Sequence, residues 1–123
     1  TTASNAQGQV VYWDDRDDFV VTPDAPADAR DIAGVTLNAV SKGNCGFIQI
    51  IGRATVKCAS SVTSTTIGNP VFVKDDDNVV DGLAIGTAWT GGHATRFLGT
   101  ALEALANDGL KQISLWRFPT NFK

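Results

Sequence analysis

The sequence has little of what metal-binding, membrane and secreted proteins usually require. Its 123 residues include two cysteines and one histidine, too few ligands for a four-ligand zinc site. No apolar run approaches the length of about 18 residues that a membrane helix needs. The N-terminus lacks a basic segment followed by an apolar stretch, so no signal peptide is expected.

Clustered positive charge is also missing. Ten basic residues stand against thirteen acidic ones, and the formal net charge is -3 with an isoelectric point near 4.8. Nucleic-acid backbones and anionic membranes both attract clusters of Lys and Arg, whereas the basic residues here are scattered. We therefore expect no direct contact with nucleic acid and no membrane binding.

The chain does contain enough apolar residues for a core, and many glycines. Hydrophobic residues make up 43% of it and twelve glycines divide it, so from Ile32 onward short apolar runs alternate with turn signals. This spacing is typical of antiparallel barrels and sandwiches. We predict an all-β fold, a small antiparallel β-barrel or sandwich. Residues 9–123 form its single β-rich domain, and the small polar residues 1–8 form a flexible N-terminal arm.

Several strands can be placed by composition. Gln9–Trp13 is β-branched and aromatic, which favours a strand, and an acidic run leads from it to the apolar Phe19–Val21. Thr22–Asp31 contains two prolines and is expected to be an irregular loop. Further on, Pro70–Lys74 and Val79–Val80 flank an acidic turn, which predicts a strand, a turn and a second strand.

Residues 46–58 predict a hairpin whose register can be tested. A three-residue loop at Ile51–Arg53 pairs Ile48 with Val56 and gathers the apolar residues on one face. A two-residue loop mixes apolar and charged side chains on the same face, but it places Cys45 opposite a second cysteine. The pattern favours the three-residue loop.

The two cysteines, Cys45 and Cys58, are therefore expected to be free thiols of a protein assembled in a reducing compartment. A disulfide between them is the alternative, because the two-residue loop brings them within bridging distance.

A second hairpin is predicted within residues 97–118. Asp108-Gly109 is typical of a two-residue hairpin turn, and that turn pairs Leu102 with Leu115 on one apolar face. The leucine spacing also fits a helix that ends at Gly109. We adopt the hairpin, in which an aspartate in place of Leu102 is expected to prevent folding.

Few residues suggest catalysis or metal binding. The single histidine, His93, follows two glycines in a predicted loop and has no recognisable nucleophile and acid around it. Asp75, Asp77 and Asp81 resemble a calcium loop, but Val79 occupies a ligand position and no Glu closes the loop. A solvated hairpin tip is the preferred interpretation. We expect no enzymatic activity, no metal and no cofactor.

Aromatic residues are the candidates for binding. The three tryptophans suit a stacking surface for sugars or bases, or equally a protein core or interface. None lies in a basic context, and we favour the core or a protein interface. The candidate interface residues are Tyr12, Trp13, Trp89, Trp116 and Phe118.

Several segments resemble small virion structural proteins of tailed bacteriophages. The likeness lies in Ala33–Val35 and Gly43–Gln49 followed by Gly52–Val56, in Ile67–Val71, and in Phe97–Ala104 followed by Gly109 and Ile113–Leu115. It extends from about Ile32 to Trp116 and rests on glycine and alternation patterns. Two positions depart from the family pattern, because Phe47 stands where Tyr or Trp is often nearby, and Asn69 replaces an Asp.

The resemblance implies a capsid decoration, or cement, protein. Such a protein binds the outer surface of the phage head after assembly in the host cytoplasm, and it stabilises contacts between capsomers. Its partners are the major capsid protein and further copies of itself, usually as a trimer. Two alternatives remain open, namely another phage structural module from a tail or head fibre, and a carbohydrate-binding or small hydrolytic domain around Trp89 and His93.

Overall fold

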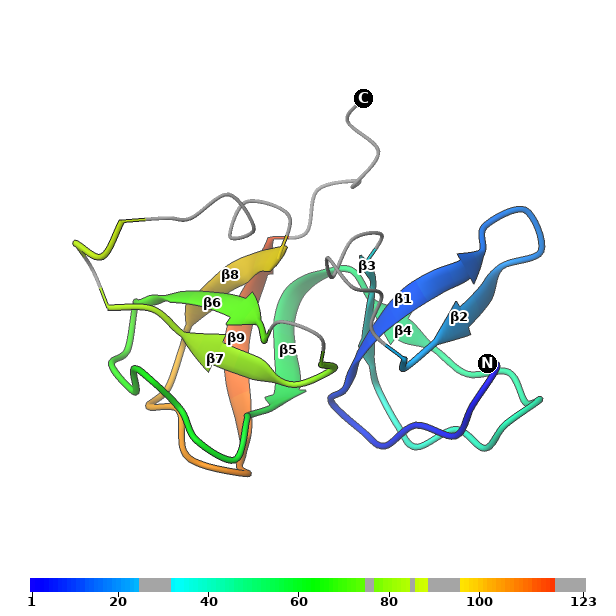
Figure 1. Cartoon of the computed structure of the whole chain (residues 1–123), viewed down its shortest axis with the longest axis horizontal. Coiled ribbons are helices and arrows are strands. Elements are labelled where there is room, and N and C mark those ends of the chain that lie inside the picture. Colours follow the sequence, from blue (N-terminus) through cyan, green and yellow to red (C-terminus); the bar gives the residue numbers. More distant parts are fainter. Residues whose placement is uncertain (25–31, 75–76, 85, 89–95, 117–123) are drawn as a thin grey trace.

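The chain folds into two antiparallel β-sheets (Figure 1). A computed structural model describes residues 1–24, 32–74, 77–84, 86–88 and 96–116, and within them every regular element is a strand. The predicted all-β class is therefore confirmed. The strands are β1 Val10–Asp15, β2 Val20–Thr22, β3 Ile32–Thr36, β4 Ile48–Gln49, β5 Ile51–Lys57, β6 Pro70–Val73, β7 Val80–Gly82, β8 Phe97–Ala101 and β9 Leu110–Trp116.

The first sheet has the strand order β2-β1-β3-β4. β1, which corresponds to the strand predicted at Gln9–Trp13, lies between β2 and β3. Its residues Val10, Val11 and Tyr12 are all buried. β1 and β2 form a hairpin through the acidic run, with Trp13 opposite Val21.

The second sheet has the order β5-β9-β8-β6-β7 and curls into a half-barrel. The predicted strand, turn and strand around residues 70–80 are confirmed, because β6 pairs with β7 and Val73 lies opposite Val80. The curl brings the end of β5 against β7, where Cys58 forms a parallel bridge with Val80 and the Ala59 amide donates to the Val80 carbonyl at 2.9 Å.

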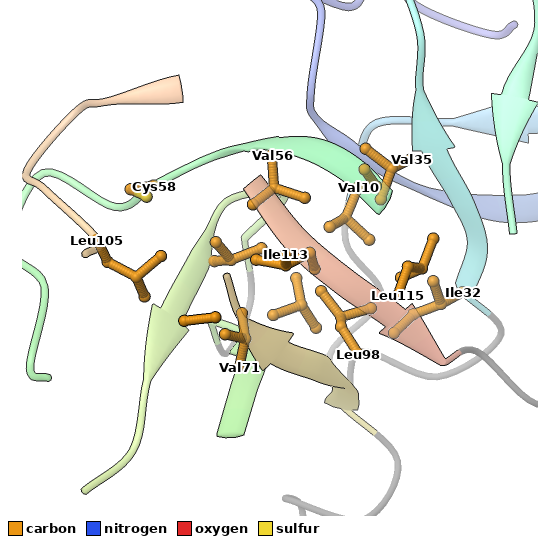
Figure 2. Close-up of a cluster of buried hydrophobic side chains, with 14 of the residues drawn as sticks. Val10, Ile32, Val35, Val56, Cys58, Val71, Leu98, Leu105, Ile113 and Leu115 are labelled. Atoms are coloured by element: carbon orange, nitrogen blue, oxygen red, sulfur yellow. The ribbon is translucent and has the colours of Figure 1, made fainter. Parts of the chain in front are cut away.

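A single hydrophobic core joins the two sheets (Figure 2). The first sheet contributes side chains from β1 and β3, and the second contributes side chains from all five of its strands, β5 to β9. Burial of these aliphatic side chains is the main force that holds the sheets together. The labelled members are Val10, Ile32, Val35, Val56, Cys58, Val71, Leu98, Leu105, Ile113 and Leu115.

The first eight residues, for which we expect a flexible arm, lie along the body of the fold. The Thr2 amide donates to Val21, and Asn5 pairs with Val40 through two backbone hydrogen bonds. Gly8 then connects the sheets, because its amide donates to the Thr36 carbonyl at 2.9 Å and its carbonyl accepts from the Lys57 amide at 2.8 Å.

The hairpin predicted for residues 46–58 is wrong. β4 pairs with β3 in the first sheet, and β5 pairs with β9 in the second, so the chain crosses between sheets at Ile50. Gly34 permits the first pairing, because a Cβ there would lie 2.6 Å from the Gln49 carbonyl oxygen. Gly52, with φ of +94°, turns the chain into a seven-residue ladder with β9. A rule for hairpins considers only neighbouring segments as partners, so it does not include the seven-residue pairing of β5 with β9.

The second hairpin is confirmed as a strand pair, but its register is three residues from the predicted one. Leu115 lies opposite Gly99 rather than Leu102. The connection spans residues 102–109, which lets Leu105 fold back into the core and leaves Leu102 40% exposed. The turn around Asp108 closes this connection and does not join the strands directly.

Candidate interaction surfaces

The candidate interface residues that the structure describes differ in exposure and do not form one surface. Tyr12 belongs to the core, because its ring is 1% exposed and its hydroxyl donates to the Asp77 carbonyl at 2.5 Å. Trp13 is half-buried, and Trp116 is 49% exposed. Trp89 and Phe118 lie outside the described residues.

Large apolar side chains gather where the chain passes from one sheet to the other. Phe47 is 77% exposed and Ile51 is 69% exposed, and Ile50 lies between them along the chain. The exposed Leu37 adjoins this run, because its amide donates to the Phe47 carbonyl. Trp116 extends it, because this residue is the cross-strand partner of Ile51. We name these five residues, Leu37, Phe47, Ile50, Ile51 and Trp116, the junction patch.

Part of the junction patch lies on the outer side of β5 and β9. Side chains alternate along these strands, so Ala54 and Ile113 point into the core while Ile51 and Trp116 point outward. Arg53 is the next outward residue on β5, and it is exposed. It lies opposite Ser114, whose hydroxyl accepts a 2.7 Å hydrogen bond from Trp116 Nε1. We name this surface, Ile51, Arg53, Ser114 and Trp116, the outer face.

Two backbone carbonyls at the outer edge of β5, beside this face, already accept hydrogen bonds. The Gln49 side-chain amide donates from Nε2 to the Ile51 carbonyl at 2.9 Å and to the Arg53 carbonyl at 2.7 Å. A strand from another chain would have to displace these bonds before pairing there. A partner at this surface would therefore have to bind it through side chains.

The β1–β2 hairpin ends in a second exposed aromatic surface. Phe19 is 80% exposed, and its ring packs edge-on against Trp13 with centroids 6.3 Å apart. Between the two lie four aspartates and Arg16, and Asp15 Oδ1 accepts the amides of Asp17 and Asp18. We name Trp13 and residues 14–19 the acidic tip.

The backbone of Phe19 adopts an unusual conformation for a large residue. Its φ of +56° lies in the left-handed region, where a bulky side chain costs about 1 kcal/mol relative to glycine. The last position of this four-residue loop suits glycine or asparagine better. An aromatic side chain is thus held in solvent at a conformational cost.

The other candidates for chemistry have structural partners or lie outside the described residues. Asp81 accepts from the Thr63 amide and hydroxyl at 2.7 and 2.6 Å, which fixes the neighbouring loop. Within the described ranges, no three His, Cys, Asp or Glu residues lie close enough to hold a metal ion. His93 and Asp75 fall outside those ranges. Cys45 is an exposed free thiol, and Cys58 is a buried one whose pKa is raised by burial.

Sequence reasoning missed the residues that the structure exposes most. Phe19 begins an apolar run, Phe47 lies in a predicted strand and Ile51 in a predicted hairpin loop, and none of these positions by itself indicates a binding surface. The signal that was available for Phe19 is its place at the end of an acidic run, where a loop normally carries polar residues.

Comparison of the chain with protein-family models, with curated proteins and with solved structures finds no match. Among the described residues, no helix is long and apolar enough to cross a membrane.

Proposed function

We propose that the chain is a capsid decoration protein of a tailed bacteriophage. It binds the outer surface of the head and stabilises contacts between capsomers, and it carries out no catalysis. The observation that supports this role is the junction patch. Monomeric proteins rarely expose several large apolar side chains together unless these side chains form a binding surface.

Two of the segments that resemble phage proteins overlap the junction patch. The motif segments 46–49 and 52–56 carry or flank Phe47, Ile50 and Ile51. An aromatic and aliphatic centre is typical of the buried part of a protein–protein interface. The apolar character of the patch therefore favours a protein over a sugar as the ligand.

The proposed partners are the major capsid protein and further copies of this chain, arranged as a trimer. Symmetry repeats one modest contact around an axis, and simultaneous engagement raises the overall affinity without new kinds of contact. The net charge of -3 is consistent with contacts to protein rather than to the packaged DNA.

Co-sedimentation with expanded, empty heads of the phage that encodes the chain tests the proposal. The wild-type chain is expected in the pellet at a saturating ratio to the capsid protein, and Phe47→Asp is expected to weaken pelleting about 30-fold or more, as for loss of a central interface anchor. Ile67→Asp is the matched control, because Ile67 is also exposed but lies outside the junction patch.

Wild-type chain that stays in the supernatant would overturn the proposal. Equal weakening by the two aspartate substitutions would show that the patch is not the contact surface. Because Phe47 lies outside the strands, its substitution is expected to leave the thermal midpoint unchanged.

A further inference from the structure

Charge is distributed unevenly along this chain. Residues 32–74 contain no Asp or Glu, and their basic residues are Lys42, Arg53, Lys57 and Lys74. The acidic tip, by contrast, holds four aspartates and one arginine within residues 14–18. The acidic tip and the segment that carries β4, β5 and most of the junction patch are therefore opposite in charge.

Each of these two surfaces also has an exposed apolar centre. On the acidic tip it is Phe19 packed on Trp13, and on the outer face it is Ile51 beside Trp116. Arg53 adjoins the second centre, is exposed, and donates to Gln112 Oε1 at 3.3 Å. Both surfaces thus combine an apolar centre with charge at its margin, as interface anchors do.

The two surfaces are separate within one chain. The acidic tip lies at the end of the β1–β2 hairpin in the first sheet, and the outer face belongs to β5 and β9 of the second (Figure 1). Complementary surfaces in different sheets of one molecule suit contact between copies, where one copy presents the tip and the next presents the face.

We propose that the chain associates with itself head to tail, with the acidic tip of one copy docked on the outer face of the next. The inference rests on the self-association included in the proposed function, and it assigns that contact to specific residues. Phe19 packs against Ile51 and Trp116 of the neighbouring copy, and the aspartates of the tip approach Arg53. Leu37, Phe47 and Ile50, the rest of the junction patch, stay available to the shell.

This contact is made through side chains, because Gln49 already occupies the carbonyls at the edge of β5. The two partners in each contact use different surfaces, so an open oligomer keeps one unused tip and one unused face, at its two ends, until a ring closes. A two-fold contact in which tip meets tip would instead bring the aspartates of two copies together.

Two variants that each block one surface test the arrangement. Phe19→Asn removes the tip anchor and places a residue that tolerates φ of +56°. Ile51→Asp blocks the outer face with a charge that the acidic tip repels, and Arg53→Glu is a second face variant at an exposed strand position. Ile67→Asp is the surface control. Sedimentation velocity of the purified full chain measures the assembly state.

The wild type and Ile67→Asp are expected to form oligomers, and each blocked variant is expected to be a monomer, with association weakened about 30-fold or more. An equal mixture of Phe19→Asn and Ile51→Asp is expected to give a complex of two chains and nothing larger, because one intact tip and one intact face remain. Association of the wild type is expected to weaken as salt rises.

A monomeric wild type at high concentration would overturn the inference, and so would a mixture that stays monomeric while both variants keep their thermal midpoints. Oligomers that survive Phe19→Asn or Arg53→Glu would also contradict it. None of these results depends on the phage shell, so binding of the wild type to expanded heads remains a separate test of the proposed function.

Discussion

Gly8 connects the two sheets, and its replacement by alanine is the most informative single change to the fold. Its φ is +78°, and a Cβ built on it would lie 3.0 Å from Leu110 Cδ2 and the Lys57 amide nitrogen and 3.1 Å from the Thr55 carbonyl oxygen. Gly43 is a matched control, because its φ is +81° and no atom lies within 4 Å of its added Cβ.

A left-handed backbone conformation costs alanine about 1 kcal/mol. Gly43→Ala is therefore expected to lower the free energy of unfolding by that amount only. Gly8→Ala has the same conformational cost and must also move backbone away from Lys57. This movement weakens the two hydrogen bonds that join the sheets, at about 1 kcal/mol each. The expected loss for Gly8→Ala is therefore about 3 kcal/mol, which separates the thermal midpoints of the two variants by about 8 °C.

Urea unfolding followed by tryptophan fluorescence measures both variants under the same conditions. The reasoning is refuted if Gly43→Ala and Gly8→Ala lower the free energy of unfolding equally, because the connection between the sheets would then contribute nothing beyond backbone strain.

Three further predictions follow from burial and close approach. Gly99→Ala is expected to cost about 3 kcal/mol or more by thermal unfolding, since its Cβ would lie 1.7 Å from the Ser114 carbonyl oxygen; a change below about 1 kcal/mol would contradict the β8–β9 register. Leu102→Asp is expected to fold with a loss under about 1 kcal/mol, because Leu102 is exposed, and failure to fold would favour the register predicted from sequence. Iodoacetamide at pH 8 is expected to label Cys45 quickly and Cys58 only on unfolding, since burial keeps Cys58 inaccessible and raises its pKa; equal rates by mass spectrometry would contradict that burial.

The sequence predicts the fold well where pairing is local. β1 and the β6–β7 pair follow directly from β-branched runs and an acidic turn, because neighbouring segments supply both the composition and the partner. The fold class follows from the same short apolar runs between glycines.

Prediction fails where a strand prefers a distant partner. Residues 46–58 satisfy a hairpin pattern, yet β5 gains seven cross-strand pairs by joining β9, and no local rule includes that alternative. The shift at Leu102 has a similar cause, because Leu105 gains burial when the connection lengthens.

The candidate surfaces were the least predictable part. Tyr12 and Phe19 are both aromatic residues of one hairpin, but the first is buried and the second is exposed. Which of them faces the core depends on how the two sheets pack, and that packing involves residues far apart in the sequence.

An electron cryomicroscopy map of the expanded phage head tests the central claim most directly. The account predicts repeated copies of this two-sheet fold on the outer surface, with the junction patch against a neighbouring protein chain. A map with no such density on the shell, or with the chain confined to the tail, would contradict it.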